Sequence, residues 1–186
     1  MLYIVGLGNY GEMYKKNRHN AGWIFLDYLS KKLNCSYKKG KGDYAYAECK
    51  DFMLFKPLTL MNLSGIVIKQ IVKHYRVSLS QLIVVYDDAD LELGVIKFKL
   101  RGSAGSHNGM KSVIYYLESE DIPRIRIGIG RHPNIPLKEW VLSDFADEEI
   151  NVLYDKFDKV YNGLLFYSQG EIEKAMQIIN TKEVKI

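Results

Sequence analysis

The sequence contains few cysteines and no apolar run long enough to cross a bilayer. Only two of the 186 residues are cysteine, Cys35 and Cys49, and their spacing matches neither a metal site nor a redox motif. We therefore interpret both as unpaired thiols, as is typical of a reducing compartment. Because no signal peptide precedes the first predicted strand, we expect a cytoplasmic protein with no membrane contact.

Several sequence signatures of catalytic sites are also missing. No serine lies in a Gly-x-Ser-x-Gly pattern, which excludes that type of nucleophile elbow. The four histidines show no His-x-His or His-x-x-x-His spacing, so we expect no metal site. There is also no internal repeat and no linker. With 47% hydrophobic and 26% charged residues, we expect residues 1–186 to form one globular domain.

The charge is only mildly basic. A net charge of +4 permits a phosphate-rich partner but does not require one, since an ordinary solvated surface has the same balance. The segment KKGKGD at residues 38–43 predicts a basic, solvent-exposed turn.

The stretch GLGNYGEMYKKNRHNAG at residues 6–22 contains Gly-x-Gly-x-x-Gly, the pattern of a dinucleotide-binding turn. That function requires a helix at the third glycine and an acid at the end of the next strand. The residues after Gly11 are too polar for a helix packed on a sheet, and Asp27, at about the right distance, lies inside a predicted helix. We therefore expect the glycines to form a tight turn that exposes Asn9, followed by a polar loop that presents His19.

Short segments rich in Val, Ile and Tyr and bounded by Gly, Pro or Asp predict strands, and apolar residues spaced three and four apart predict helices. The predicted strands are Leu2–Val5, Tyr44–Cys49, Met53–Lys56, Leu82–Tyr86, Val95–Leu100 and Arg124–Ile129. The predicted helices are Trp23–Leu33, Leu63–Tyr75, Gly109–Leu117, Asp147–Ser168 and Gly170–Ile179. Their alternation predicts an α/β fold with a mixed, largely parallel twisted sheet and helices on both faces.

Unusual polar residues follow the predicted strands. They are Asn9, His19, Asn62, Asp87 and Asn108. Ligands of open α/β sheets bind beyond the carboxyl ends of the strands, so parallel strands would bring these residues into one crevice.

The residue types in this crevice suggest hydrolysis. A histidine oriented by Asp87 is a plausible general base, and without a side-chain nucleophile its simplest substrate is water. Asparagine amides can hold a peptide backbone or donate to an oxyanion. Each residue also has a structural alternative. His19 could cap a helix, Asn20 and Asn62 resemble N-caps, and Asp87 and Asn108 could be turn residues. His19, His107 and the acids could alternatively form a metal site.

Five ordered segments together resemble the bacterial-type peptidyl-tRNA hydrolase family. They are GLGNYGEMYKKNRHNAG, KPLTLMNLSG, VVYDDADLELGVIKFKLRGSAGSHNGMKS, RIRIGIG and VLSDF, and they extend from the first strand to Phe145. The resemblance implies a monomeric α/β enzyme without cofactor or metal that hydrolyses the ester between peptide and tRNA.

The resemblance also implies roles for individual residues. His19 matches the catalytic histidine and Asp87 its paired carboxylate. Asn9, Asn62 and Asn108 match asparagines that hold the peptide and ester, Met61 lines the same cleft, and Tyr14 matches a tyrosine near the tRNA 3′ end. Lys99 and Arg126 match a basic pair associated with the tRNA 5′ phosphate. The alternative for these two is that Lys97, Lys99, Arg124 and Arg126 form the solvent faces of two strands.

Three positions depart from the usual family pattern. Tyr10 replaces a common proline, Tyr86 stands where histidine is frequent, and Ser106 replaces a usual glycine. None of them removes a proposed catalytic group. A non-catalytic RNA-binding protein on the same scaffold is the rival function, and the presence of both His19 and Asp87 favours the enzyme. A nucleotide-dependent oxidoreductase is supported only by the glycine pattern.

Overall fold

The computed structural model describes residues 1–181, which form one α/β domain. Within this range seven strands form a single mixed sheet in the order β2-β3-β4-β1-β5-β7-β6. The strands are β1 (Leu2–Gly6), β2 (Lys38–Lys39), β3 (Tyr44–Glu48), β4 (Phe52–Pro57), β5 (Leu82–Asp88), β6 (Ile96–Lys99) and β7 (Arg124–Gly128). The α-helices are α1 (Ala21–Lys32), α2 (Ser64–Tyr75), α3 (Asn108–Leu117), α4 (Leu137–Leu142), α5 (Asp147–Ser168) and α6 (Ile172–Asn180). Short 3₁₀ helices are η1 (Glu12–Tyr14), η2 (Arg18–Asn20), η3 (Met61–Leu63) and η4 (Leu79–Gln81).

The centre of the sheet is parallel, as predicted. Strand β1 pairs in parallel with β4 and β5, and β5 pairs in parallel with β7. Strands β3 and β6 are antiparallel to their neighbours β4 and β7. The carboxyl ends of β1, β4, β5 and β7 therefore lie at one edge of the sheet.

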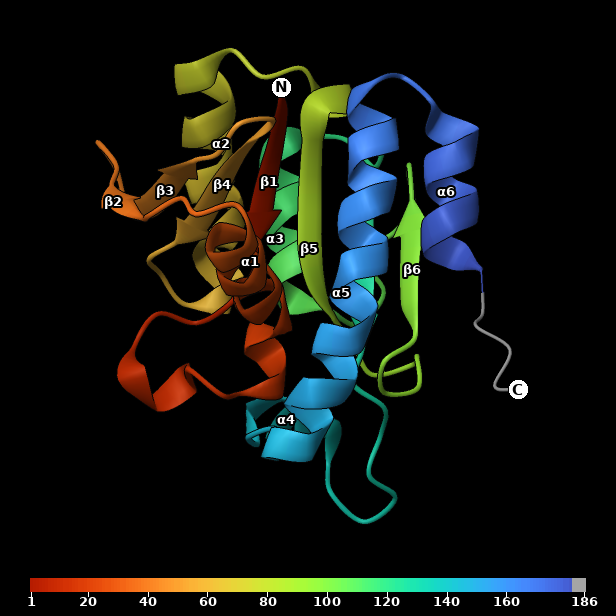
Figure 1. Cartoon of the computed structure of the whole chain (residues 1–186). Coiled ribbons are helices and arrows are strands. Elements are labelled where there is room, and N and C mark those ends of the chain that lie inside the picture. Colours follow the sequence, from red (N-terminus) through yellow and green to blue (C-terminus); the bar gives the residue numbers. More distant parts are fainter. Residues whose placement is uncertain (182–186) are drawn as a thin grey trace.

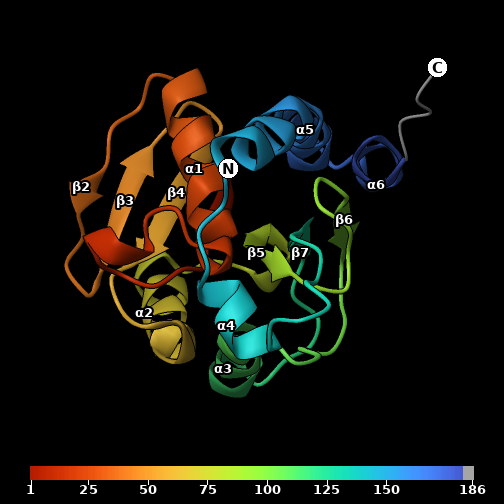
Figure 2. The ribbon, with the colours of Figure 1, turned by 90° about the horizontal axis from the view of Figure 1, so that it is seen from below.

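Helices cover both faces of the sheet (Figure 1). Helices α1, α5 and α6 lie on one face and α2 and α3 on the other, and Figure 2 looks onto the edge where α4 lies. The side chains of β5 point alternately to the two faces of the sheet and contribute to both cores. Ile83 and Val85 belong to the core under α1 and α5, whereas Leu82 and Val84 belong to the core under α2 and α3.

Strands β6 and β7 have two chemically different faces. Ile96 and Phe98 of β6, with Ile125 and Ile127 of β7, pack into the core under α5 and α6. The intervening residues are basic. They are Lys97, Lys99, Arg124 and Arg126, and the antiparallel register places Lys97 opposite Arg126 and Lys99 opposite Arg124. The period of two along a strand thus gives these two strands one apolar and one cationic face.

The predicted strands and helices are all present, with ends shifted by one or two residues. Two short elements were not predicted. They are α4 and β2, where Lys38 and Lys39 pair with β3 inside the segment predicted as a turn. A two-residue edge strand carries too little periodicity to detect.

The two cysteines are joined in a disulfide, so their interpretation as unpaired thiols is wrong. Cys35 lies just after α1 and Cys49 just after β3, and their Cα atoms are 5.4 Å apart. The bond connects segments that are 14 residues apart in the sequence, a relation that spacing alone did not reveal. Among residues 1–181, no helix combines the length and apolar character needed to cross a membrane.

Candidate active site

The glycine-rich segment after β1 serves close packing. A Cβ on Gly6 would come within 2.6 Å of the Gly22 carbonyl oxygen, and one on Gly8 within 2.7 Å of the Trp23 ring. These glycines therefore allow the end of β1 to lie directly against α1. Gly11, at φ +132°, is followed by the three-residue η1 and not by a long helix. Asp27, the candidate ribose ligand, lies inside α1 and not at the end of a strand, and it forms an ion pair with Lys56, so neither requirement of a dinucleotide site is met.

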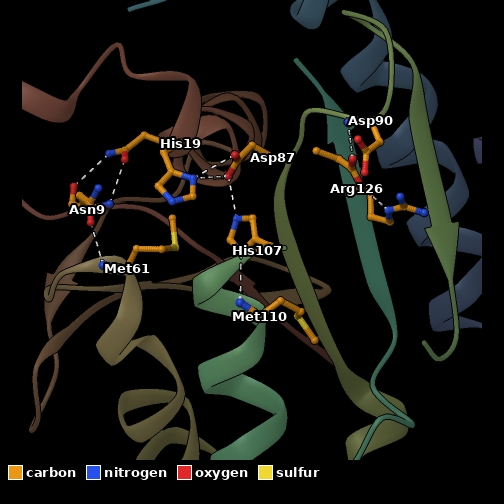
Figure 3. Close-up of polar contacts among 10 residues, drawn as sticks. Asn9, His19, Met61, Asp87, Asp90, His107, Met110 and Arg126 are labelled. Atoms are coloured by element: carbon orange, nitrogen blue, oxygen red, sulfur yellow. Dashed lines mark hydrogen bonds and ion pairs between the residues drawn. The ribbon is translucent and has the colours of Figure 1, made fainter. Parts of the chain in front are cut away.

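His19 and Asp87 are in direct contact (Figure 3). The Nδ1 atom of His19 lies 2.9 Å from each carboxylate oxygen of Asp87. Since a carboxylate accepts only, Nδ1 carries the proton and Nε2 is the basic nitrogen of the ring. The sequence predicted this pair, and η2 and the end of β5 bring its members together.

His107 is a second partner of Asp87, which the sequence analysis considered only as a metal ligand. The backbone N–H of Met110 donates to its Nδ1 at 3.1 Å, so His107 also acts as the N-cap of α3. Its Nε2 therefore carries the proton and donates to Asp87 Oδ1 at 2.9 Å. The ring of Tyr86, one of the residues that depart from the family pattern, lies 4.7 Å from the His107 ring.

Asp87 is thus buried between two imidazole rings, and its side chain is only 2% exposed. Burial acts to raise the pKa of this carboxyl, but His107 and His19 together outweigh that effect and hold the pKa well below its ordinary value. The carboxylate is therefore ionised at neutral pH.

Asn20 links the His19 segment to Asn9. Its side-chain Oδ1 accepts from the Asn9 backbone N–H at 2.9 Å, and its Nδ2 donates to the Asn9 carbonyl at 3.0 Å. The Asn9 side-chain Oδ1 in turn accepts from the Met61 backbone N–H at 2.7 Å (Figure 3). The side chain of Asn20 therefore does not cap α1, contrary to the N-cap alternative. Asn9 is only 6% exposed because these bonds hold it inside the fold, so the expectation of an exposed Asn9 is wrong.

The other predicted substrate-binding residues differ in burial. Met61 is buried, with its sulfur close to Gly109, where an added Cβ would lie 2.4 Å from Sδ. Asn62 is exposed in η3, Asn108 is exposed at the start of α3, and Tyr14 is half-buried in η1. Neither η3 nor α2 uses the side chain of Asn62 as a cap.

A cleft of about 720 Å³ opens beside the histidine pair. Its walls include His19, Asp87, Asn108, Lys99 and Arg126, together with residues of α4. It therefore connects the candidate catalytic residues with the cationic face of β6 and β7. Asn9, Tyr14, Met61 and Asn62 are not part of this cavity wall. Of these, Asn9 and Met61 are bonded to each other on the far side of His19 from Asp87 (Figure 3).

The loop that carries His107 and Asn108 reaches the site by another route than expected. Because β6 is antiparallel, it ends at the opposite edge of the sheet, where the Gly102 N–H donates to the Glu120 carbonyl. The chain then returns to His107 beside Asp87. The prediction that this loop follows a carboxyl end at the site edge is therefore wrong, although Asn108 does reach the cleft.

The basic residues of β6 and β7 differ in their surroundings. Lys99 is exposed, whereas Arg126 donates from Nε to Asp88 Oδ2 at 2.5 Å. Arg124 is buried and donates to the carbonyls of Ile122, Ser103 and Glu120. The interpretation of these residues as a plain solvent face is therefore wrong for Arg124.

His19, Asp87 and His107 form a possible metal-ligating group, with ligand atoms within 4.8 Å of one another. The sequence spacing did not reveal it, because its members come from three separate segments. In the structure these same atoms bond to one another through the two N–H groups described above. An ion at this position would have to displace both protons.

Comparisons with known proteins agree over nearly the full length. The family model described as peptidyl-tRNA hydrolase matches residues 3–186. The peptidyl-tRNA hydrolase of Pseudothermotoga lettingae is 40% identical over 185 residues, which cover 99% of each chain. That of Thermotoga maritima is 42% identical over 99% of this chain and all of its own. The crystal structure of peptidyl-tRNA hydrolase from Acinetobacter baumannii matches with a TM-score of 0.90 at 29% identity, covering 98% of this chain and 96% of that one.

Proposed function

Because the chain belongs to the peptidyl-tRNA hydrolase family, a family of enzymes, we propose that it cleaves the ester bond between peptide and tRNA in peptidyl-tRNA. The products are a free peptide and a free tRNA. The reaction thereby recovers tRNA from peptidyl-tRNA that was released prematurely. The observation that carries this proposal is the His19–Asp87 pair at the wall of a cleft bordered by Lys99 and Arg126. A non-catalytic RNA-binding protein would not need a buried, ionised carboxylate beside that histidine.

His19 acts as the general base. Its Nε2 takes a proton from water, and the resulting hydroxide attacks the ester carbonyl carbon. Asp87 holds the ring in the Nδ1–H tautomer and stabilises the imidazolium that forms, while His107 donates to the same carboxylate. When the tetrahedral intermediate collapses, the ester C–O bond breaks and the ribose oxygen takes the proton back from the imidazolium. An ester has a better leaving group than an amide, so water activated by one base suffices.

The peptide lies on the side of His19 where Asn20 is bonded to Asn9 and Asn9 to Met61. The amides of Asn62 and Asn108 pair with the peptide backbone and donate to the developing oxyanion. Asn9 contributes its Nδ2 donors, since its Oδ1 is engaged by the Met61 N–H, and Met61 and Tyr14 complete the apolar and aromatic lining. Backbone recognition suits a substrate whose peptide sequence varies.

The tRNA lies over the cationic face of β6 and β7. Lys99 and Arg126 contact the phosphate at the 5′ end of the acceptor stem. We propose that the enzyme acts as a monomer without metal or cofactor, and that it is cytoplasmic on the strength of its family relationship, despite the disulfide between Cys35 and Cys49. Turnover by the protein after dialysis against EDTA checks the metal part of this proposal.

The decisive experiment is incubation with N-acetyl-aminoacyl-tRNA and measurement of the deacylated tRNA released. We expect wild-type protein to release it, and His19→Ala to lose about 10²- to 10⁴-fold in kcat while still binding deacylated tRNA. A folded His19→Ala variant with normal turnover would remove His19 from the role of general base.

A further inference from the structure

Arg18, the residue before His19, has its side chain inside the protein. This side chain is only 6% exposed. Its Nη1 and Nη2 donate to the two carboxylate oxygens of Glu149 in α5 at 3.0 and 2.8 Å, and its Nε donates to Ser143 Oγ at 3.1 Å. The guanidinium carbon lies 3.7 Å from the centroid of the Trp140 ring and 4.9 Å from that of Phe145.

The backbone around Arg18 is bonded to the same segment. The Arg18 N–H donates to the Ser143 carbonyl at 2.9 Å, and the Phe145 N–H donates to the Lys16 carbonyl at 2.8 Å. Asn17 and Asp144 form the bridge between these two bonds. Residues 16–18 and 143–145 therefore pair as two short antiparallel segments, although they lie more than 120 residues apart in the sequence. We call this pairing the 16–145 seam.

The seam joins the candidate base to a wall of the cleft. Leu137, Lys138 and Val141 of α4 line the cleft beside His19, and Trp140 of the same helix lies against the Arg18 guanidinium. On its other side, His19 is followed by Asn20, which is bonded to Asn9. His19 is thus held from both neighbouring residues, through Arg18 to α4 and α5 and through Asn20 to the peptide side of the site.

We infer that Arg18 is a positioning residue for the reaction proposed above: it fixes His19 against Asp87 and holds α4 at the cleft. The inference rests on the proposed function. Arginine suits this role because its planar fork matches both oxygens of Glu149 while its face stacks on Trp140. A lysine would keep the charge but would lose the bidentate bond and the stacking.

The test measures kcat and KM of Arg18→Gln, Arg18→Lys and Glu149→Gln with N-acetyl-aminoacyl-tRNA and with N-acetyl-aminoacyl-adenosine, which lacks the tRNA body. We expect Arg18→Gln to lower kcat on both substrates by about 10- to 100-fold, because a displaced base reacts from the wrong geometry. Binding of deacylated tRNA should change less than twofold. Arg18→Lys and Glu149→Gln should fall between Arg18→Gln and the wild type.

Lys16→Gln is the matched control. It removes a cation from the same seam, but Lys16 and its partner Asp147 are exposed, at 57% and 80%. We expect its kcat to stay within about twofold of the wild type, as is typical of exposed pairs.

A second readout separates positioning from simple stabilisation. In the proton NMR spectrum, the Nδ1–H signal of His19, assigned by its loss in His19→Ala, should weaken or shift in Arg18→Gln and be partly restored in Arg18→Lys. If kcat per folded molecule and this signal both match the wild type, Arg18 serves only the fold and the inference is overturned. If Arg18→Gln fails to fold, Glu149→Gln and Arg18→Lys decide by the same two criteria. A wild type that cleaves neither substrate would contradict the proposed function itself.

Discussion

Hydrogen bonds around Asp87 determine which nitrogen of each neighbouring ring carries a proton. The N–H of Met110 engages Nδ1 of His107, which leaves Nε2–H to donate to Asp87. His19 presents Nδ1–H to the same carboxylate and keeps Nε2 as its basic atom. A capping interaction at the start of α3 is therefore coupled, through one carboxylate, to the tautomer of His19.

The acid stability of the protein should depend on Asp87. Its pKa lies below the ordinary value of 3.8 in the folded protein, so this carboxylate contributes stability above pH 4 that is lost as the pH falls toward the folded-state pKa. Below pH 4 the unfolded chain takes up a proton at this position that the folded protein does not.

We therefore expect the free energy of unfolding of the wild type to fall more steeply below pH 4 than that of Asp87→Asn, by up to about 1.4 kcal/mol per pH unit. Urea titrations between pH 7 and 3 measure both slopes. Parallel curves would show that Asp87 binds protons equally in the folded and unfolded states.

Exposed asparagines offer a cleaner test of the peptide site than Asn9 does. Asn9→Ala would also remove the acceptor of the Met61 N–H and disturb η3. Asn62→Ala and Asn108→Ala remove exposed side chains. Each should cost about 0.5–1.5 kcal/mol of transition-state stabilisation, which lowers kcat/KM roughly 2- to 10-fold. Binding of deacylated tRNA, measured in parallel, should not change. Wild-type kinetics in both variants would favour the turn and helix-start roles of these residues.

At the scale of elements, the crossing of α2 and α3 sets the spacing between Asn62 and Asn108, which lie near the starts of these helices. Gly65 in the first turn of α2 lies against α3, and its N–H donates to Ser112 Oγ at 3.0 Å. A Cβ at Gly65 would lie 2.1 Å from the Ser112 carbonyl oxygen, whereas a Cβ at Gly109 would lie 2.4 Å from the Met61 sulfur and 3.0 Å from the His107 ring. The Met61 side chain can turn away, whereas the backbone at Ser112 cannot.

Two alanine substitutions should therefore differ in cost. Gly65→Ala must push two backbones apart, so we expect it to lower the free energy of unfolding by about 3 kcal/mol. Gly109→Ala should cost about 1 kcal/mol, because Met61 is flexible and can repack. Thermal or urea unfolding of both variants measures this order. The reverse order would mean that the α2–α3 crossing adapts more easily than the Met61 side chain.

At the scale of the whole molecule, neighbouring carboxylates partly neutralise the cationic face of β6 and β7. Asp88 pairs with Arg126, and Asp90 accepts from Arg131 at 2.6 Å. Lys99 is exposed at the cleft. A phosphate bound here would thus meet an exposed lysine and an arginine that is already paired with a carboxylate.

The salt dependence of tRNA binding tests this arrangement. Lys99→Ala should flatten the slope of log affinity against log salt by about 0.7–0.9, and it should raise KM for peptidyl-tRNA more than it lowers kcat. Arg126→Ala should weaken binding further at low salt, because it leaves Asp88 unpaired near the phosphate. Asp88→Asn is the opposite control and should tighten binding. Equal losses on peptidyl-tRNA and on the adenosine ester would place Lys99 and Arg126 in the chemistry or the fold.

From the sequence alone we predicted the α/β class, a mixed and largely parallel sheet, and Asp87 as the partner of His19; the structure has all three. Local periodicity specifies strands and helices, and polar residues placed after buried strands point to the edge where those strands end. The family motifs gave residue roles that the geometry is compatible with, such as Lys99 and Arg126 at one cleft.

Only the tertiary structure decided the contacts between segments that are distant in the sequence. The disulfide of Cys35 with Cys49, the bond of His107 to Asp87 and the seating of Arg18 on Glu149 each depend on how loops pass one another in space. The direction of β6 is a further case, because alternation is the same for parallel and antiparallel strands. Side-chain pattern reports which face of an element is buried, whereas partners across loops are fixed by the packing of the whole chain.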